Sequence, residues 1–572
     1  MYGRQLWLSL KNCLSPRTFA PVRRLLYLLA ALLLLPALLI NLDAMVFIDD
    51  EAIRSLVAQE MRWSGNYLAP TMHGDAYLNK PPAWNWILAL SFWLHGVATE
   101  WSARLPTVVC LLGYAATVWA FSRRYFPNSL AVVHALTVVT CGRMLFWDSM
   151  LALIDVCFSW VTYVQIVVLY HYGRRDAWWR AFLFSYLLTA LGFMLKGLPA
   201  VVFQGLSVLA ILGWRRAWWQ FVRLPHLLSG LLCVALLAGY YWAYSAYVDL
   251  GQVAERMFVE SGKRTAVAHG WGDTLGHLLA FPFEMGYHFL PWTLLLPLLV
   301  LPGARAELRR NSFAGFCTVA FLVNIPVYWL SPNVYPRYLL MLMPLLFAPL
   351  LFLFRRAGTR EQRYFKRAVT YLFLVAMGLA TLLLPLVPLL PPVALVEAAW
   401  WKALGSCAPA LLLTYLGWVD VRHRGGRNFL LVFACFLLVL RIVFNFFVLP
   451  PRAAGDVRGL AVRESAERLV ARTAGDSLYV YGFTLIEPAT GFYLSRARGR
   501  FVRRRFEGFD STSHYIVSPL QYPELAVHAV DSLYLRHLNR QYPVGRLPDP
   551  PAGRAPLNEL PRDGMGSGMM LR

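Results

Sequence analysis

Long apolar runs separated by short polar segments make up most of the first 450 residues. A helix needs about 20 mainly apolar residues to cross a membrane. Thirteen runs predict thirteen crossings, at residues 25–42, 105–121, 128–146, 156–172, 181–195, 198–213, 227–247, 289–302, 313–331, 338–354, 368–390, 403–419 and 429–449. A further run at 84–94 is shorter and contains Asn85, and we expect an interfacial or re-entrant helix there. The pattern predicts a mainly α-helical, polytopic membrane protein.

The composition of the 572 residues agrees with this interpretation. Hydrophobic residues make up 58% of the chain and charged residues 15%, whereas soluble globular proteins carry about 25% charged residues. The eight cysteines lie mostly inside apolar runs. We therefore expect them to be small core residues rather than a disulfide framework or metal pairs. A soluble protein and a single-pass receptor are excluded.

The net charge of +23 can indicate nucleic-acid binding or loops held on the cytoplasmic side of a bilayer. The distribution favours the second interpretation. With the N-terminus inside and thirteen crossings, the inside loops hold more Lys and Arg than the longer outside loops. A full crossing at 84–94 would invert this asymmetry. We expect the N-terminus in the cytoplasm, the first apolar run to be an uncleaved crossing, and no nucleic-acid partner.

The pattern changes after Pro450–Pro451, where charged residues alternate with short apolar stretches. It predicts a helix at 457–472 and β-rich runs at 477–482, 491–494 and 513–517. We therefore divide the chain into a transmembrane domain at 1–450, a small α/β domain at 451–547 on the extracytoplasmic side, and a disordered tail at 548–572. The tail is rich in Pro, Gly and Met.

Two long outer loops, at 43–104 and 249–288, are the candidates for function, because long loops usually carry it. The first begins with Asp49, Asp50 and Glu51 at the end of the first crossing. Ionisable groups next to a membrane are costly unless they pair or function. The alternative is that Asp49 or Asp50 caps the helix that follows.

Short motifs follow in a defined order along the two loops and the neighbouring crossings. In the first loop they are Asp50-Glu51-Ala52, Ala58-Gln59-Glu60-Met61, Ser64-Gly65-Asn66-Tyr67-Leu68-Ala69-Pro70, Lys80-Pro81-Pro82 and Ala103-Arg104-Leu105-Pro106. Further on they are Ile154-Asp155, Lys196-Gly197, Phe258-Val259-Glu260 with Lys263-Arg264, Pro291-Trp292 and Tyr335-Pro336-Arg337-Tyr338. This succession, over about 25–355, resembles the polyprenyl-phosphate-sugar-dependent glycosyltransferases of the GT-C fold. That superfamily includes the aminoarabinose transferases of lipid A and the protein O-mannosyltransferases.

The resemblance implies a multi-pass enzyme of the inner (plasma) membrane. It would transfer a hexosyl or pentosyl group from a polyprenyl-phosphate-linked donor to a hydroxyl of a lipid, glycan or protein, on the extracytoplasmic side of the cell envelope. Such a transfer needs a base at the attacking oxygen and positive charge at the departing phosphate. Asp50 matches the family's first acid. Glu51 points about 100° away from Asp50 on a helix, which favours one active carboxylate and inversion by single displacement.

Asp155 matches the family's second acid, with helix capping as its alternative role and Asp148 as its competitor. For the donor phosphate the resemblance selects Lys80, with Arg264 and Tyr338 as helpers and Arg337 and Lys263 as alternatives. Lys80 can instead extend toward lipid headgroups without taking part in catalysis.

The motif at Lys80 departs from the family in one position. Aminoarabinose transferases typically have Glu-Lys-Pro, and that glutamate can help bind a divalent metal, but this chain has Asn79-Lys80-Pro81. A metal requirement therefore stays open, and no ligand set or other cofactor is identified.

The alternative function is that of a polytopic transporter or lipid flippase of the envelope, which would also be basic on the inside. A transporter predicts charged residues on broken helices near mid-membrane and a repeat between two halves. The acids of this chain gather instead at the predicted outer face, and the sequence has no internal repeat.

Overall fold

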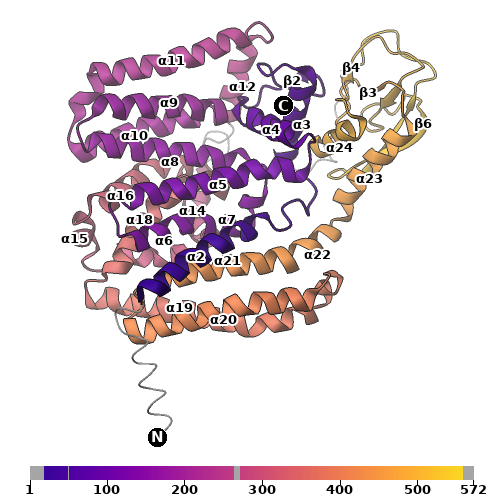
Figure 1. Ribbon diagram of the computed structural model, residues 1–572. Coiled ribbons are helices and arrows are strands. Elements are labelled where there is room, and N and C mark those ends of the chain that lie inside the picture. Colours follow the sequence, from indigo (N-terminus) through magenta and orange to yellow (C-terminus); the bar gives the residue numbers. More distant parts are fainter. Residues whose placement is uncertain (1–18, 49, 263–270, 558–572) are drawn as a thin grey trace.

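A computed structural model describes residues 19–48, 50–262 and 271–557. The long helices lie side by side in one bundle, and a small sheet domain projects from one end of it (Figure 1). Nine helices or helix pairs in the described part of the chain are long and apolar enough to cross a membrane. They are α2 (Phe19–Leu39), α5 (Glu100–Ser122), α8 (Ile154–Gly173), α9 (Trp178–Lys196), α11 (Leu224–Tyr244), α16 (Ser312–Asn324) with α17 (Pro326–Trp329), α19 (Arg360–Leu383) with η6 (Leu384–Leu389), α20 (Ala399–Arg424), and α21 (Phe429–Phe447) with α22 (Leu449–Ala454).

The prediction of thirteen crossings is not confirmed, because four of the apolar runs form short or broken elements. α6 (Asn128–Thr140) and α7 (Gly142–Phe146) with η2 (Asp148–Met150) are bent by 61° and make at most a tenth span. The other three runs form α10 (Pro199–Arg215), η4 (Trp292–Leu299), and η5 (Pro336–Leu339) with α18 (Met343–Arg356). Proline contributes to these breaks, since it lacks the N–H that a continuous helix needs. Pro297 lies inside η4, and Pro344 stands in the first turn of α18.

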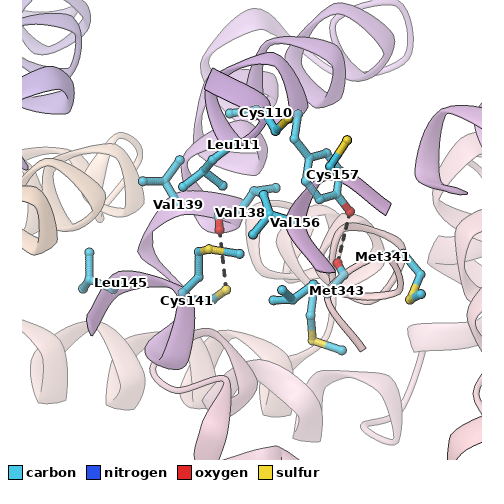
Figure 2. Close-up of a cluster of buried hydrophobic side chains, with 14 of the residues drawn as sticks. Cys110, Leu111, Val138, Val139, Cys141, Leu145, Val156, Cys157, Met341 and Met343 are labelled. Atoms are coloured by element: carbon cyan, nitrogen blue, oxygen red, sulfur yellow. Dashed lines mark hydrogen bonds between the residues drawn. The ribbon is translucent and has the colours of Figure 1, made fainter. Parts of the chain in front are cut away.

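The buried core of the bundle lies between these elements. Figure 2 shows part of it, with Cys110 and Leu111 of α5, Val138 and Val139 of α6, Cys157 of α8, and Met343 of α18 around one apolar region. The seven cysteines of the described residues are all buried and free. This confirms their predicted role as small core residues, apart from Cys13, which lies outside the described residues.

The segment predicted as the first outer loop contains α3 (Asp50–Ser64), the two-stranded ribbon of β1 (Thr71–Met72) and β2 (Asp75–Ala76), and α4 (Ala83–His95). With 13 residues, α4 is too short to cross a membrane, as expected for the 84–94 run. The second outer loop contains α12 (Leu250–Gly262) and α14 (Trp271–His288). The remaining helical elements of the bundle are η3 (Trp218–Val222), α15 (Ala304–Arg309) and η7 (Pro391–Leu395).

The C-terminal domain combines α23 (Val457–Arg472) and α24 (Pro488–Arg498) with a five-stranded sheet in the order β4-β3-β5-β7-β6. The strands are β3 (Leu478–Tyr481), β4 (Arg504–Arg505), β5 (His514–Ile516), β6 (His528–Leu535) and β7 (Arg540–Arg546). β3 pairs in parallel with β4 and β5, and β7 pairs antiparallel with β5 and β6. The predicted helix at 457–472 and the strands within 477–482 and 513–517 are confirmed.

The β-rich run predicted at 491–494 is wrong, because this segment lies in α24. Pro488 stands in the first turn, where its fixed φ suits a helix. Phe492 and Tyr493 then pack against Phe47, so tertiary contacts override their β propensity. In the predicted tail, Ala555 is buried and donates its N–H to the carbonyl of Phe506 at 2.7 Å, so the tail contacts the domain at this residue.

α24 attaches the C-terminal domain to the first outer loop. The Tyr493 hydroxyl accepts a hydrogen bond from the Phe47 N–H at 2.9 Å and donates one to Glu100 Oε1 at 2.7 Å. Gly491 faces the His73 ring so closely that a Cβ there would come within 2.4 Å of it. The Arg504 side chain pairs with Asp75 at 3.0 Å. The domain is therefore docked on the segment that leads into α3.

We expect acid to weaken this docking through His73. Burial, with the charge of Arg504 adding to it, lowers the pKa of His73 from 6.5 to about 3. The unfolded chain then binds more protons than the folded chain between these values, so stability falls as the pH drops below 6.5. From pH 7 to pH 5 the loss is about 2 kcal/mol. It should be read from thermal unfolding of the purified protein at both pH values.

His73→Gln should remove most of this pH dependence, whereas the same change at the exposed His528 should leave it intact. An equal loss of stability in the parent and in His73→Gln would contradict the assignment.

Candidate active site

Four side chains from four separate segments meet at the end of the bundle that carries α3. Asp50 begins α3, Asp155 lies in the first turn of α8, Lys196 ends α9, and Arg337 lies in η5. Lys196 Nζ is 2.5 Å from Asp155 Oδ1, and Arg337 Nε is 3.5 Å from Asp155 Oδ2. Arg337 Nη2 donates to Asp50 Oδ2 at 3.3 Å. We call these four residues the charged cluster.

The two carboxylates of the charged cluster differ in exposure. The Asp155 side chain is 7% exposed and lies between two cations, Lys196 and Arg337, that are buried to a similar degree. The Asp50 side chain is 49% exposed. Asp155 therefore acts as a counter-ion that holds the cations in place, whereas Asp50 keeps one side open to a ligand.

Aromatic rings surround the cations of the charged cluster. The Lys196 ammonium lies 3.9 Å from the ring centroid of Tyr338 and 5.2 Å from that of Phe158. The Arg337 guanidinium lies 4.6 Å from the ring centroid of Tyr335. The negative face of an aromatic ring stabilises a cation most where water is excluded. These rings stabilise and orient the two cations.

Lys80 approaches the charged cluster from the first outer loop. It lies between β2 and α4, is partly buried, and interacts electrostatically with Asp155. Trp84, in the first turn of α4, donates its indole N–H to the carbonyl of Ala152 at 3.1 Å. This bond holds the start of α4 against the segment that leads into α8. With Lys80 included, three cations face the two carboxylates, so an anion is favoured at this place.

Asp148, the competitor of Asp155, has a different partner. Its carboxylate accepts hydrogen bonds from Arg143 Nε at 3.0 and 3.1 Å. Lys196 and Arg337 make their ion pairs with Asp155. Asp155 makes these ion pairs from the first turn of α8, and its side chain does not cap the helix.

Glu51 and Arg104 form a buried ion pair beneath the charged cluster. Arg104 donates to both oxygens of Glu51, at 2.8 and 3.1 Å, and both side chains are at most 2% exposed. Glu51 also accepts the N–H groups of Ile48 and Ala152. Arg104 donates in addition to the carbonyls of Leu42, Met45 and Val46. The pair joins the start of α3, α5 and the segment before α8.

A second buried carboxylate, Glu60, holds the ribbon of β1 and β2 to α3. It accepts hydrogen bonds from Thr71 Oγ1 at 2.8 Å, from the His73 N–H at 2.6 Å and from the Gly74 N–H at 3.2 Å. Burial raises the pKa of Glu60, and these three donors oppose the shift. The chain runs from this ribbon directly to Lys80. By fixing the ribbon on α3, Glu60 helps to fix the position of the Lys80 backbone.

The structure brings together several of the residues selected from the sequence and separates others. Asp50, Asp155, Arg337 and Tyr338 meet, and Lys80 lies close to them. Lys263 and Arg264 lie outside the described residues. Glu51, selected as a neighbour of the catalytic acid, is buried against Arg104, so its contacts are those of a structural residue.

Sequence reasoning gave no role to Lys196, although the motif Lys196-Gly197 contains it. Its position at the end of a crossing was the available signal, because an ammonium there needs a partner. The partner, Asp155, begins the preceding helix, and only the antiparallel packing of α8 on α9 places the two side chains together.

The sequence does not decide whether the protein needs a divalent metal. Within the described residues, no group of three or more His, Cys, Asp or Glu side chains is arranged to hold a metal ion. Asn79 is exposed and stands where a glutamate is typical of the aminoarabinose transferases.

Comparison with known proteins supports the resemblance seen in the motifs. The family model of dolichyl-phosphate-mannose-protein mannosyltransferases matches residues 79–242. An undecaprenyl phosphate-alpha-4-amino-4-deoxy-L-arabinose arabinosyl transferase of Pseudomonas fluorescens is 27% identical over 330 residues, which cover 52% of this chain and 54% of the relative. The corresponding enzyme of Pseudomonas aeruginosa is 24% identical over 316 residues, with the same coverage. The chain thus spans about half the length of the curated relatives it matches.

The solved structures extend the likeness to nearly the whole chain. The crystal structure of ArnT from Cupriavidus metallidurans bound to undecaprenyl phosphate superposes with a TM-score of 0.66 and 17% identity, covering 91% of this chain and 97% of that one. The chain has the GT-C fold. The apo structure of the same protein gives a TM-score of 0.59 at 16% identity, covering 93% of this chain and 98% of that one. The predicted GT-C membrane architecture is confirmed.

We expect Arg104→Met to destabilise the protein strongly, because it leaves the Glu51 carboxylate buried without its cation. Removing one partner of a buried ion pair costs about 3–5 kcal/mol. Thermal unfolding of the purified variant should therefore begin well below that of the parent. Arg62→Met, on the less buried end of α3, is the matched control and should unfold near the parent temperature. Equal unfolding temperatures for both variants would show that the pair does not organise the site.

Proposed function

We propose that this protein is an integral membrane glycosyltransferase. It transfers a sugar from a polyprenyl-phosphate-linked donor to an acceptor hydroxyl, by inverting single displacement. The observation that supports this best is the charged cluster, in which the half-exposed Asp50 lies 3.3 Å from Arg337 and Lys80 brings the cations to three against two carboxylates. The arrangement combines a base with an anion site, the two groups that the transfer requires.

The cluster suggests a division of roles during the transfer. The acceptor oxygen forms a bond to the anomeric carbon while the bond from that carbon to the phosphate oxygen breaks. The hydroxyl proton goes to Asp50, and the electron pair leaves with the lipid phosphate. Lys80, Lys196 and Arg337 stabilise the charge that develops on the phosphate, and Tyr338 orients Lys196. Asp155 is a positioning residue, since it holds Lys196 and Arg337 without an exposed face.

The comparisons support the donor class. The structural neighbour binds undecaprenyl phosphate, and the curated relatives transfer an aminoarabinose from an undecaprenyl phosphate carrier. We propose a pentosyl or hexosyl group on a polyprenyl phosphate as the donor, and a lipid, glycan or protein of the cell envelope as the acceptor. Hydrolysis of a nucleotide is not required, because the lipid phosphate is itself the leaving group.

We propose further that the charged cluster and the C-terminal domain lie on the extracytoplasmic side of the inner membrane, with the N-terminus in the cytoplasm. The opposite end of the bundle is rich in basic residues, among them Arg310, Arg355, Arg356 and Arg427. An excess of Lys and Arg is typical of cytoplasmic loops.

A transporter or flippase is not favoured. Transport sites lie near mid-membrane on broken helices, whereas Asp50, Asp155 and Lys196 stand at the ends of continuous helices. The fold and the curated relatives agree with a transferase.

We expect Asp50→Asn to reduce turnover about a hundredfold or more, because general-base catalysis contributes roughly 10²–10⁴. The assay is consumption of a polyprenyl-phosphate-linked sugar by the purified protein, at saturating donor. The unfolding temperature should stay near that of the parent, since the side chain is half exposed. Asp43→Asn, an exposed acid of the same loop, is the matched control and should keep parental turnover. Parental turnover in Asp50→Asn would remove this residue from the mechanism.

For Lys80→Gln we expect weaker donor use, because one of three cations around the phosphate is lost. A charge-assisted hydrogen bond contributes about 1.5–3 kcal/mol, so kcat/KM for the donor should fall roughly tenfold to a hundredfold. Lys80→Arg retains the charge and should keep most of the activity. If Lys80 only contacts lipid headgroups, both variants will keep the kcat/KM of the parent.

A further inference from the structure

A basic pocket of about 530 Å³ lies at the end of the bundle opposite the charged cluster. Four parts of the chain form it: the start of α6, α15, the end of α18 with the first turns of α19, and the connection from α20 to α21. In Figure 1, α15 lies at the end of the bundle away from the C-terminal sheet domain. The pocket is therefore separate from the proposed active site by the length of α18, which begins six residues after Arg337 and ends at the pocket.

Cations dominate the lining of this pocket. Among the described residues that line it, one is acidic, and six are basic: Arg310, Arg355, Arg356, Lys366, Arg424 and Arg427. The acid, Glu307, pairs with Arg310 at 2.6 Å and with Arg356 at 3.2 Å. Asp420, just behind the pocket, accepts hydrogen bonds from the backbone and side chain of Asn428. Even with Asp420 included, cations outnumber carboxylates six to two.

Arg355 is the central cation of the pocket. Its guanidinium donates to Ser129 Oγ at 3.1 Å, in the first turn of α6. It is partly buried and faces two other guanidinium groups, those of Arg23 and Arg427. Like charges brought together in a partly desolvated place repel each other, and a bound anion removes that repulsion. The first turn of α6, which has no side-chain cap, adds N–H groups with partial positive charge.

The position of the pocket indicates what kind of anion enters it. It lies where lipid-facing helices end. Two of its neighbours, α19 and α20, expose apolar side chains such as Leu379 and Leu411 along their length, and α2, which carries Arg23, exposes Leu28 and Leu32. Acyl chains can lie along these helices while a phosphate enters the pocket. A volume of this size accommodates a phosphate together with a small polar headgroup.

We propose that this pocket is a binding site for the headgroup of an anionic phospholipid. Arg355 and Arg427 bind the phosphate oxygens, and the Ser129 hydroxyl donates a hydrogen bond to one of them. The acyl chains lie along the exposed apolar side chains of α19 and α20, such as Leu379 and Leu411. Occupancy neutralises the guanidinium groups, so the lipid stabilises the packing of α6 and α18 on the α20–α21 connection. This proposal does not depend on the proposed transferase activity.

The test measures lipid binding to the full-length protein purified in a non-ionic detergent. Retained lipid is counted by native mass spectrometry, and unfolding temperature is recorded during titration with phosphatidylglycerol, with phosphatidylcholine, or with inorganic phosphate. The pocket variant carries Arg355→Gln and Arg427→Gln. The matched control carries Arg305→Gln in α15 and Arg367→Gln in α19. Both arginines are exposed and lie on elements that help to form the pocket, but neither lines it.

We expect phosphatidylglycerol to bind the parent and the control equally and to raise their unfolding temperatures. The pocket variant should bind it about thirtyfold more weakly, because each of the two basic residues near an anionic lipid contributes about 1 kcal/mol. Phosphatidylcholine and inorganic phosphate should bind all three proteins weakly.

Three results would overturn the proposal. The control could lose as much affinity as the pocket variant, which would indicate general attraction to headgroups. Inorganic phosphate could stabilise the parent as well as the lipid does, which would indicate a soluble ligand. The pocket variant could keep the lipid affinity of the parent, which would count against the site. If this variant does not fold, Arg427→Gln alone replaces it, since the Arg427 side chain is exposed in a loop.

Discussion

The buried ion pair of Glu51 and Arg104 is the interaction on which the organisation of the charged end of the bundle depends. One carboxylate receives two hydrogen bonds from the guanidinium and two more from backbone N–H groups. These donors come from the residues just before α3, from α5 and from the segment before α8. A buried carboxylate is stable only when its oxygens are satisfied, so the three segments are held in one arrangement. Asp50, the neighbour of Glu51, consequently lies within 3.3 Å of Arg337, which also pairs with Asp155.

Adjacent acids thus have different roles because their surroundings differ. Glu51 is enclosed and fully hydrogen-bonded, whereas Asp50 has half of its side chain exposed beside Arg337. Asp155 is buried but lies between Lys196 and Arg337, which makes it the counter-ion of an anion site. The exposed acid is available for proton transfer, and the buried acids position the cations and the backbone around it.

The C-terminal domain contributes to this arrangement from outside the bundle. Tyr493 binds the N–H of Phe47 and the carboxylate of Glu100, and Arg504 pairs with Asp75. These contacts fall on the segment immediately before α3, on the start of α5 and on the ribbon before Lys80. The domain therefore holds both ends of the first outer loop. The basic pocket at the other end of α18 gathers a second surplus of cations in the same bundle, on different residues.

Much of the fold could be predicted from the sequence because burial in a bilayer imposes a simple rule, that an apolar run must form a helix. The class of the protein, its main crossings, the short helix α4, the helix at 457–472 and the acid at Asp50 follow from local pattern and motif order. Local pattern could not decide which apolar runs break at proline, as in η4, or that 491–494 is helical, because those outcomes depend on packing partners. The pairings of Lys196 with Asp155 and of Glu51 with Arg104 join residues 41 and 53 positions apart. Only the tertiary structure determines these pairings. The sequence gives the charge of each side chain, but which counter-ion lies next to it depends on how the helices pack.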